Sequence, residues 1–263
     1  MTAYAAIFSA RFRTLLQYRA AAAAGFATQV CWGFIRVMIF EAFYASSAHT
    51  QPMRLDEMIT YIWLGQCLLG LLPFQPDGDV RQMIRTGAVA YEMVRPVDLY
   101  GFWYARAIAD RLGPTVLRAV PMMVLAGLFL GLKPPPTWQC AAAWCAGTAG
   151  AVLISAALTT LMTISLLWTT AGDGIARLTP PTVFFLSGMI LPLVFLPSAV
   201  QPIVNALPFR DIVDVPFRLY MGHIPISQWG AIFAQEAAWI AILIGLGRVF
   251  LAQGLRKLVV QGG

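Results

Sequence analysis

Charge is scarce in this sequence. Asp, Glu, Lys and Arg make up only 11% of the 263 residues, whereas a soluble domain averages about 25%. Hydrophobic residues account for 59%. A larger soluble core cannot explain this excess, because the buried fraction grows slowly with chain length. The surface therefore has too little charge to face water on all sides, and we expect an all-α integral membrane protein.

Cysteine and histidine are also few. The four cysteines lie in apolar runs without a C-x-x-C pair, and both histidines, His49 and His223, fall in expected loops. Neither pattern is typical of a metal site, so no metal ligands are predicted. Arginines gathered at one membrane face explain the net charge of +6 better than nucleic-acid binding does. No cleavable signal peptide is expected, since Arg36 interrupts the first apolar stretch.

Catalytic signatures are missing as well. A P-loop needs G-x-x-x-x-G-K-[ST] to cradle phosphates, and neither lysine, Lys133 or Lys257, stands in that context. The sequence has no G-x-S-x-G or H-E-x-x-H motif and no paired-carboxylate arrangement. We therefore expect a chain that is not an enzyme and binds no cofactor of its own.

Long apolar runs are abundant. A spanning helix needs about 20 mostly apolar residues, and six spans are expected within a single domain, 1–263. The expected spans are 20–44, 58–74, 112–132, 138–168, 184–200 and 229–251.

Residues 1–19 have a different pattern. Ile7, Phe12 and Leu15 share one side at helical spacing, while Arg11 and Arg13 are charged. This pattern predicts a helix lying in the membrane interface, with its arginines bound to anionic lipid.

Two longer regions interrupt the spans. Residues 77–111 hold the longest charged stretch and are expected to form an amphipathic loop rather than a span. Residues 192–228 combine repeated prolines with four charged residues. Broken backbone survives at membrane depth only where protein or water satisfies its polar groups. We expect short re-entrant helices there, at the outer side.

Basic residues near span ends predict the orientation, because cytoplasmic loops carry more Lys and Arg. With the N-terminus inside, the outer segments hold only Arg54, Lys133, Arg210 and Arg218. The inner segments hold Arg11, Arg13, Arg19, Arg81, Arg85, Arg95, Arg106, Arg111, Arg177, Arg248, Arg256 and Lys257. Both termini are therefore expected in the cytoplasm.

The candidates for ionisable residues near the midplane of the expected spans are Arg36, Glu41 and Glu236. Arg36 and Glu236 lie at matching depths, about 12 and 10 Å from the outer ends of their helices at 1.5 Å per residue. An ion pair between them would avoid leaving either charge alone in lipid. The alternative, that each snorkels or faces its own cavity, is equally compatible with the sequence.

Three motifs resemble one transporter family. The stretch 84–98, IRTGAVAYEMVRPVD, resembles the I-R-x-G and Y-x-x-x-R-P signature of type-2 ATP-binding cassette (ABC) exporter permeases. The segment 186–192, LSGMILP, and the stretch 207–222 resemble that family's fifth span and its L-P-F…P-x-R-x-Y-x-G region, and the closing VQGG, 260–263, is typical of one branch.

The resemblance implies a six-span permease that pairs with a second permease copy, identical or homologous. Two copies of an ABC ATPase subunit would bind ATP and Mg beneath the pair. The loop at 79–91 would form a coupling helix seated on the ATPase, with Arg81, Arg85, Tyr91 and Glu92 as contacts. The alternative for this loop is a face that only meets solvent or lipid headgroups.

The resemblance also implies an outer gate in the broken fifth span. Gly188 and Pro192 would allow bending. The residues expected to line the translocation path or the dimer seam, or else simply to pack, are Phe184, Phe185, Met189 and Phe195.

The expected function is ATP-driven export of an amphipathic or lipid-like molecule across a bacterial cytoplasmic membrane. Membrane lipid is a partner and nucleic acid is not. Two alternatives remain open: an ion-gradient-driven secondary carrier or channel, and a membrane assembly factor or enzyme. The charged inner loop and the lack of a midplane carboxylate cluster favour the first function.

Overall fold

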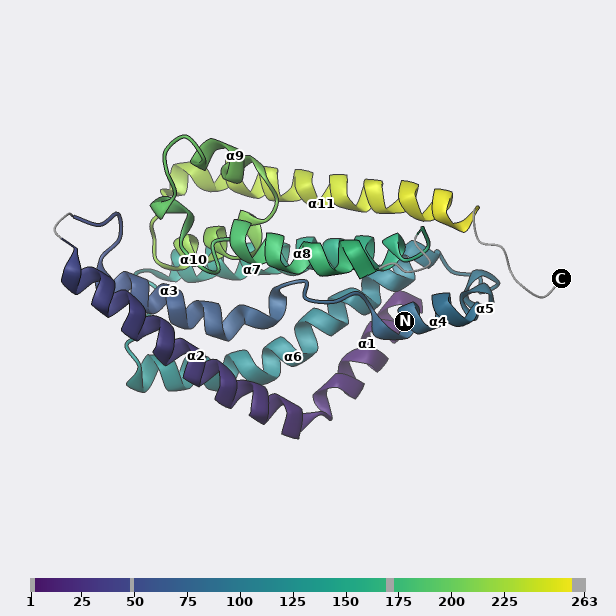
Figure 1. Ribbon diagram of the computed structural model, residues 1–263, viewed down its shortest axis with the longest axis horizontal. Coiled ribbons are helices and arrows are strands. Elements are labelled where there is room, and N and C mark those ends of the chain that lie inside the picture. Colours follow the sequence, from purple (N-terminus) through teal and green to yellow (C-terminus); the bar gives the residue numbers. More distant parts are fainter. Residues whose placement is uncertain (1–2, 48–49, 169–172, 257–263) are drawn as a thin grey trace.

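Every regular element in the described part of the chain is helical (Figure 1). The computed structural model describes residues 3–47, 50–168 and 173–256. His49, Lys257, part of the expected inner loop (169–172) and the closing 260–263 lie outside these ranges. The elements are α1 (Ala3–Leu16), α2 (Arg19–Ser46), α3 (Leu55–Leu68), η1 (Leu69–Leu71), α4 (Gly78–Thr86), α5 (Val89–Met93), α6 (Leu99–Phe129), α7 (Trp138–Ser165), α8 (Asp173–Leu186), η2 (Leu193–Phe195), α9 (Gln201–Ala206), η3 (Arg210–Ile212), α10 (Asp214–Tyr220) and α11 (Ile226–Leu255).

Among the described residues, four helices are long and apolar enough to cross a membrane, namely α2 from Ala20, α6, α7 and α11. Each has 27 to 31 residues, or about 40 Å at 1.5 Å per residue, which exceeds the hydrocarbon thickness of about 30 Å. The chain is therefore a multi-pass membrane protein. Helices α3 and α8 have 14 residues each, about 21 Å, and are shorter than the spans expected there.

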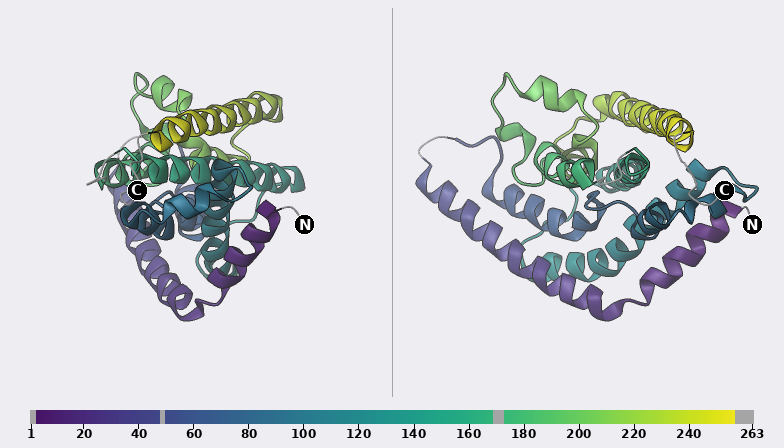
Figure 2. Two further views of the ribbon diagram at one scale, coloured as in Figure 1. Left: turned by 90° about the vertical axis from the view of Figure 1, so that its right-hand side faces the viewer. Right: turned by 45° about the vertical axis from the view of Figure 1, so that its right-hand side comes forward.

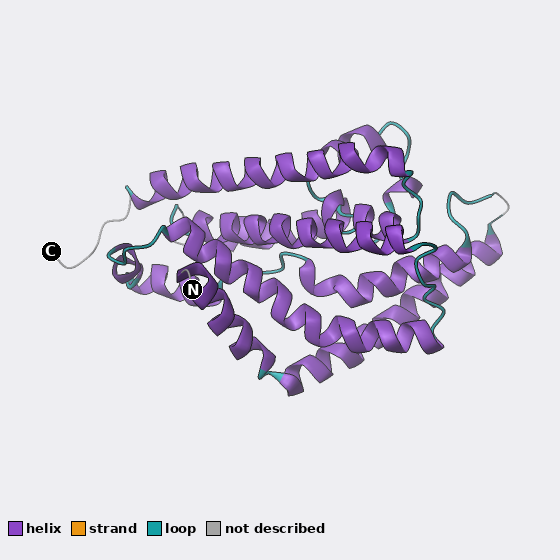
Figure 3. Ribbon diagram, turned by 180° about the vertical axis from the view of Figure 1, so that it is seen from behind, coloured by secondary structure: helices purple, strands orange, loops and turns teal. Residues whose placement is uncertain are grey.

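The helices run back and forth between two ends of the molecule (Figure 1). We call the end that holds α4, α5 and the last turn of α11 the basal end, and the end that holds α9 and α10 the distal end. Figure 2 shows α1 descending from the basal end to meet α2, and Figure 3 shows the same division from behind. Helix α1 packs against α6, and its expected place in the membrane interface stays a prediction.

Helix α7 is the centre of the bundle. It packs against α6, α8, α10, α11 and η3, and its 28 residues include no Asp, Glu, Lys, Arg or His. Its threonines bond within the helix: Thr159, Thr160 and Thr163 donate to carbonyl oxygens four residues earlier. Because these three hydroxyls are satisfied locally, they can be buried inside the bundle without partners on other helices.

Two expected boundaries are wrong. The third span begins at Leu99 rather than 112, so 99–111 belongs to α6 and not to a loop. Asp98 caps this helix by accepting from the amide of Gly101 at 2.9 Å, and the arginines that suggested a loop are buried or paired, as with Arg111, whose Nη1 donates to the carbonyl of Leu72. Charge alone was therefore a poor marker of the helix start.

The helix found near the expected fifth span is also displaced. Helix α8 runs from Asp173 to Leu186, with Pro180 and Pro181 inside it, instead of from 184 to 200. The chain turns at Gly188, whose φ is 88°, a backbone region in which glycine pays no steric penalty. Residues 192–228 then form short helices and turns, η2, α9, η3 and α10.

Replacing Trp63 tests the packing of α3 against α2. The indole is 1% exposed. A Cβ added to Gly33 would lie only 2.3 Å from its ring. Trp63→Ala should lower the free energy of unfolding by about 3–5 kcal/mol, measured by denaturation of the purified chain in detergent. Trp138→Ala is the control, because that side chain is 77% exposed; equal losses in the two variants would contradict this packing.

Candidate functional site

The basal helix α4 is defined by its two ends. Asp77 caps it by accepting hydrogen bonds from the amides of Asp79 at 2.9 Å and Val80 at 3.2 Å. The helix ends at Gly87, which has a φ of 75°, as helices often do at a left-handed glycine. The amide of Asp77 also donates to Thr163 Oγ1 of α7 at 3.1 Å. The sequence thus folds 78–86 into a short helix fixed to the bundle at its start.

Five charged side chains join α4 to α1 and α6. Arg106 of α6 contacts Asp77 and Asp79, each at 2.8 Å, and Arg11 of α1 contacts Asp79 at 2.7 Å and Asp110 at 2.8 Å. We call these residues the basal ion network. Two arginines alternate with three aspartates, so each charge meets a charge of opposite sign. The network holds α1, α4 and α6 as one unit.

The electrostatics favour the charged forms of Asp77 and Arg11. Burial opposes the charge of Asp77, but the hydrogen bonds and charge of Arg106 outweigh it and lower the pKa of Asp77. Burial likewise opposes the charge of Arg11, and its hydrogen bond and attraction to Asp110 raise the pKa of Arg11. Arg11 was expected to bind anionic lipid; in the structure it binds aspartates instead, while Arg13 is exposed.

The residues predicted to contact the ATPase differ in their surroundings. Arg85 and Tyr91 are exposed, Tyr91 to 77%, and Arg81 is half-buried. Glu92, also predicted as a contact, is only 5% exposed and accepts a hydrogen bond from Trp103 Nε1 at 2.8 Å. Its side chain fastens α5 to α6 and does not reach the surface.

Two exposed residues beside Tyr91 were missed. Met93 and Val94 are 45% and 81% exposed at the end of α5. Large apolar side chains exposed at a polar end are typical of a protein contact surface. We call Arg85, Tyr91, Met93 and Val94 the α4–α5 surface. A helix of five residues has too little periodicity to reveal its exposed side in the sequence.

At the distal end, the turn after α8 is held from two other helices. Arg36 Nη2 of α2 donates to the carbonyl oxygens of Met189 at 2.6 Å and Ile190 at 3.1 Å. Tyr61 of α3 donates to the carbonyl of Gly188 at 3.0 Å. These bonds satisfy backbone oxygens that the helix break leaves without partners. Residues 188–190 form the distal turn.

The structure brings the predicted gate residues together only in part. Gly188, Met189 and Pro192 are buried around the distal turn, while Phe184 and Phe195 are half-buried. These five residues therefore pack against other parts of the chain. Only Phe185, which is 55% exposed, points away from it.

The expected Arg36–Glu236 ion pair is not formed. Arg36 uses the carbonyl oxygens of the distal turn, and Glu236 lies against Gly150 of α7 instead. The pair was predicted from the matching depths of the two residues along their helices. However, α2 and α11 lie on different sides of α7 and do not bring the two side chains together (Figure 1).

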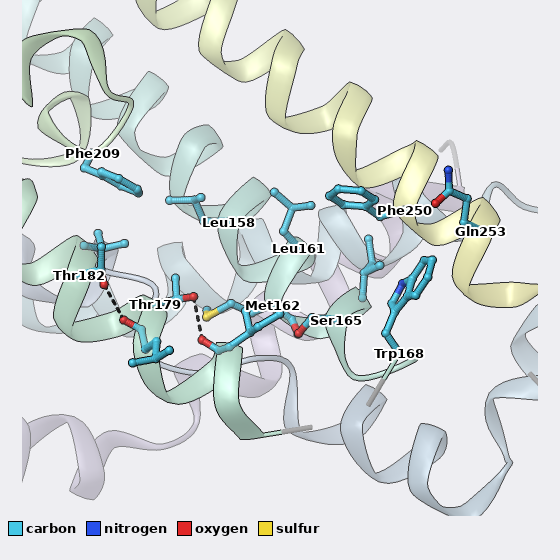
Figure 4. Close-up of a pocket in the computed structure, with 14 residues that line it drawn as sticks. Leu158, Leu161, Met162, Ser165, Trp168, Thr179, Thr182, Phe209, Phe250 and Gln253 are labelled. Carbon is cyan, nitrogen blue, oxygen red and sulfur yellow. Dashed lines mark hydrogen bonds between the residues drawn. The ribbon is translucent and has the colours of Figure 1, made fainter. Parts of the chain in front are cut away.

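An apolar pocket of about 680 Å³ lies between α7, α8 and α11. Figure 4 shows Thr179 and Thr182 on one wall, Phe250 and Gln253 on the other, and Leu161 between them. The hydroxyl groups of both threonines donate to carbonyls of their own helix. The pocket therefore presents mainly hydrocarbon. None of the predicted gate residues lines it.

A group of three or more metal-ligating side chains does not occur among the residues that the structure describes. Nothing in the described geometry thus offers a metal centre, and the features with functional potential are the α4–α5 surface, the distal turn and the apolar pocket.

Together these features define a helical, multi-pass membrane protein with a fastened polar element at one end and a broken helix at the other. The family model described as ABC-2 family transporter protein matches residues 30–262. The chain belongs to this family and is a permease of an ABC transporter, which confirms the resemblance drawn from the motifs. Membership implies an ABC ATPase as partner. Comparison with curated proteins finds no match.

Removing Arg11 tests the basal ion network. Arg11→Gln breaks two ion pairs, and a loss of about 1–2 kcal/mol corresponds to a roughly 5- to 30-fold change in an opening equilibrium. Backbone amides of α4 should exchange with deuterium faster by this factor. Arg13→Gln, two residues away and exposed, should leave α4 unchanged; similar exchange in both variants would mean that the network does not anchor α4.

Proposed function

We propose that this chain is the membrane-spanning subunit of an ATP-driven exporter of an amphipathic or lipid-like molecule, energised by separate ATPase subunits. The basal ion network carries the proposal, because it connects an exposed surface to a helix that spans the membrane. The chain itself binds neither ATP nor Mg, which belong to the partner.

The first step is contact with the ATPase. Tyr91, Met93 and Val94 offer exposed apolar area, and Arg85 adds positive charge. Aromatic, Met and Arg side chains are enriched at protein interfaces. Arg81 lies beside this surface. We assign the α4–α5 surface as the coupling contact, with Glu92 supporting it from inside.

The second step is transmission. Arg106 and Asp110 lie on α6, which runs from the basal to the distal end. A push on α4 reaches α6 through Asp77, Asp79 and Arg11 without a flexible segment between them. Rigid-body movement of packed helices is a common form of switching. Closure of the ATPase would in this way shift the bundle.

The third step is opening at the distal turn. Gly188 supplies the hinge, and Met189 and Pro192 are buried around it. Phe184, Phe185 and Phe195 line the outer path or the seam with a second permease copy, identical or homologous. The exposed apolar side chains of α2 and α8 support such a seam, among them Met38 at 66% and Leu178 at 69%.

The topology follows the alternating course of α2, α3, α6, α7, α8 and α11, six crossings in all. The arginine-rich basal end is cytoplasmic, with both termini there, two ATPase copies beneath the permease pair and a bacterial cytoplasmic membrane around it. The pocket between α7, α8 and α11 supports an apolar or amphipathic cargo, because its walls are mainly hydrocarbon.

Substituting Tyr91 tests the assigned contact. Tyr91→Asp places a charge in the apolar part of the α4–α5 surface, and loss of an interface anchor costs about 2 kcal/mol, roughly 30-fold in affinity. The dissociation constant of the purified ATPase should rise accordingly. Tyr18→Asp is the control, since Tyr18 is 62% exposed at the α1–α2 junction. Equal binding by both variants would remove the α4–α5 surface from the interface.

Reconstitution tests the energy source. Liposomes holding the chain alone should show no ATP hydrolysis. Adding the cognate ATPase should produce hydrolysis and ATP-dependent efflux of lipid-like probes. Transport driven by a proton or sodium gradient without any ATPase would instead establish a secondary carrier.

A further inference from the structure

Two buried carboxyl groups lie against the distal half of α7. Glu236 of α11 is 4% exposed and Asp211 of η3 is fully buried. Both α11 and η3 pack against α7, and the two carboxyl groups lie within electrostatic range of each other. Among the described residues, Glu236 Oε1 and both carboxyl oxygens of Asp211 have no hydrogen-bond partner.

Gly150 makes room for this pair. A Cβ at Gly150 would lie 2.0 Å from Glu236 Oε1 and 2.1 Å from its carboxyl carbon. Both distances are far shorter than any van der Waals contact, so the carboxyl group rests directly on the backbone of α7. The side chain is therefore aimed into the helix interface and away from lipid.

Few charges are available to balance two carboxylates. Arg210 Nε lies 3.4 Å from Asp211 Oδ1, while its Nη2 donates to Gln235 at 2.9 Å. Helix α7 has no ionisable acid or base other than its cysteines. From α10, the buried Asp214 adds a further negative charge, itself 3.5 Å from Arg218 and bonded by Tyr61 of α3.

Ionisation of both carboxyl groups would thus leave one arginine against two neighbouring negative charges in a buried site. Isolated buried charge is very costly, and such groups usually become neutral instead. Two carboxyl groups that share a site behave similarly: one retains its proton well above the ordinary range.

We propose that the buried carboxyl groups of Asp211 and Glu236 form a proton-binding site that stays protonated while the distal end is closed. Opening of the distal end hydrates the pair, the proton passes from the carboxyl group to water, and a carboxylate remains. The ligand is a proton, and its release marks the open state. This inference does not rest on the direction of transport or on the ATPase contact.

The electrostatics of η3, which lies between spans, agree with this. Burial raises the pKa of Asp211 to about 7, Arg210 opposes the change and Asp214 adds to it. Unfolded aspartate has a pKa of about 3.9. Between these two pKa values, the folded chain therefore binds more protons than the unfolded chain. The stability that protonated Asp211 contributes should be fully present below about pH 4 and should be lost as the pH rises through 7.

Infrared spectroscopy detects the proton directly. Spectra of the full chain in lipid nanodiscs at pH 6 and pH 9 should differ by a carboxylic-acid C=O band that is present at pH 6. Asp211→Asn and Glu236→Gln should each weaken this band, because either change removes one of the two carboxyl groups of the site. Glu41→Gln, an exposed glutamate on α2, should leave the band unchanged.

The pH dependence of thermal stability supplies a second test that does not require the band. The folding equilibrium constant of the unmodified chain should fall by up to about tenfold per pH unit through this window. In Glu236→Gln the fall should be smaller, and the variant should be the more stable one at pH 9.

Three results would overturn the proposal. The first is a C=O band that is as strong in both variants as in the unmodified chain. The second is a variant less stable than the unmodified chain at pH 9. The third is saturable stabilisation by Na⁺ at pH 9 that both variants abolish, which would make the site a cation site. Loss of ATPase binding in Tyr91→Asp leaves all three measurements unaffected, so the two proposals fail separately.

Discussion

Charge buried in an apolar bundle must find its partner within the chain, and this constraint organises both ends of the molecule. Isolated charge in a low-dielectric interior is too costly to persist. At the basal end, arginines and aspartates from three helices neutralise one another. At the distal end, Arg36 has no carboxylate and uses backbone oxygens instead. Each solution fixes a different part of the chain.

The hydrogen bonds at the distal end link Arg36 of α2 to the break after α8. A continuous α8 would use its own carbonyl oxygens, and Arg36 would then have no acceptor there. The break at Gly188 frees those oxygens, and Arg36 and Tyr61 then stabilise the break by binding them. The charge of Arg36 in α2 and the irregular backbone after α8 therefore depend on each other. A movement that straightened α8 would also release Arg36.

The sequence predicts the parts of the fold that depend on composition. Apolar runs located α2, α7 and α11 to within a few residues, and the motifs indicated the family. The start of α6 was missed because Arg106 and Arg111 suggested a loop. Their partners, Asp77 and the Leu72 carbonyl, lie about 30 to 40 positions away in sequence. Pairing over such distances depends on helix packing, which local hydropathy does not encode.

The predicted site residues show the same division between properties that depend on local sequence and properties that depend on helix packing. Tyr91 and Arg85 are exposed as a contact surface requires, because their motif is local. Glu92 is adjacent in sequence but points inward to Trp103, which only the packing of α5 on α6 determines. The Arg36–Glu236 pair was inferred from depth alone. Depth follows from counting residues, whereas the direction of each side chain around its helix depends on neighbours.

Helix α7 explains how one bundle accommodates both polar ends. It meets the basal element through Thr163, which accepts from the amide of Asp77, and it meets the distal acids through Gly150. Having no charge of its own, α7 needs no counter-ion when its surroundings move. A change in hydration along it would therefore act on Asp211 and Glu236, whose buried carboxyl oxygens include several without a hydrogen-bond partner. The protonation of that pair would then differ between a closed and an open bundle, even though α7 itself contributes only backbone.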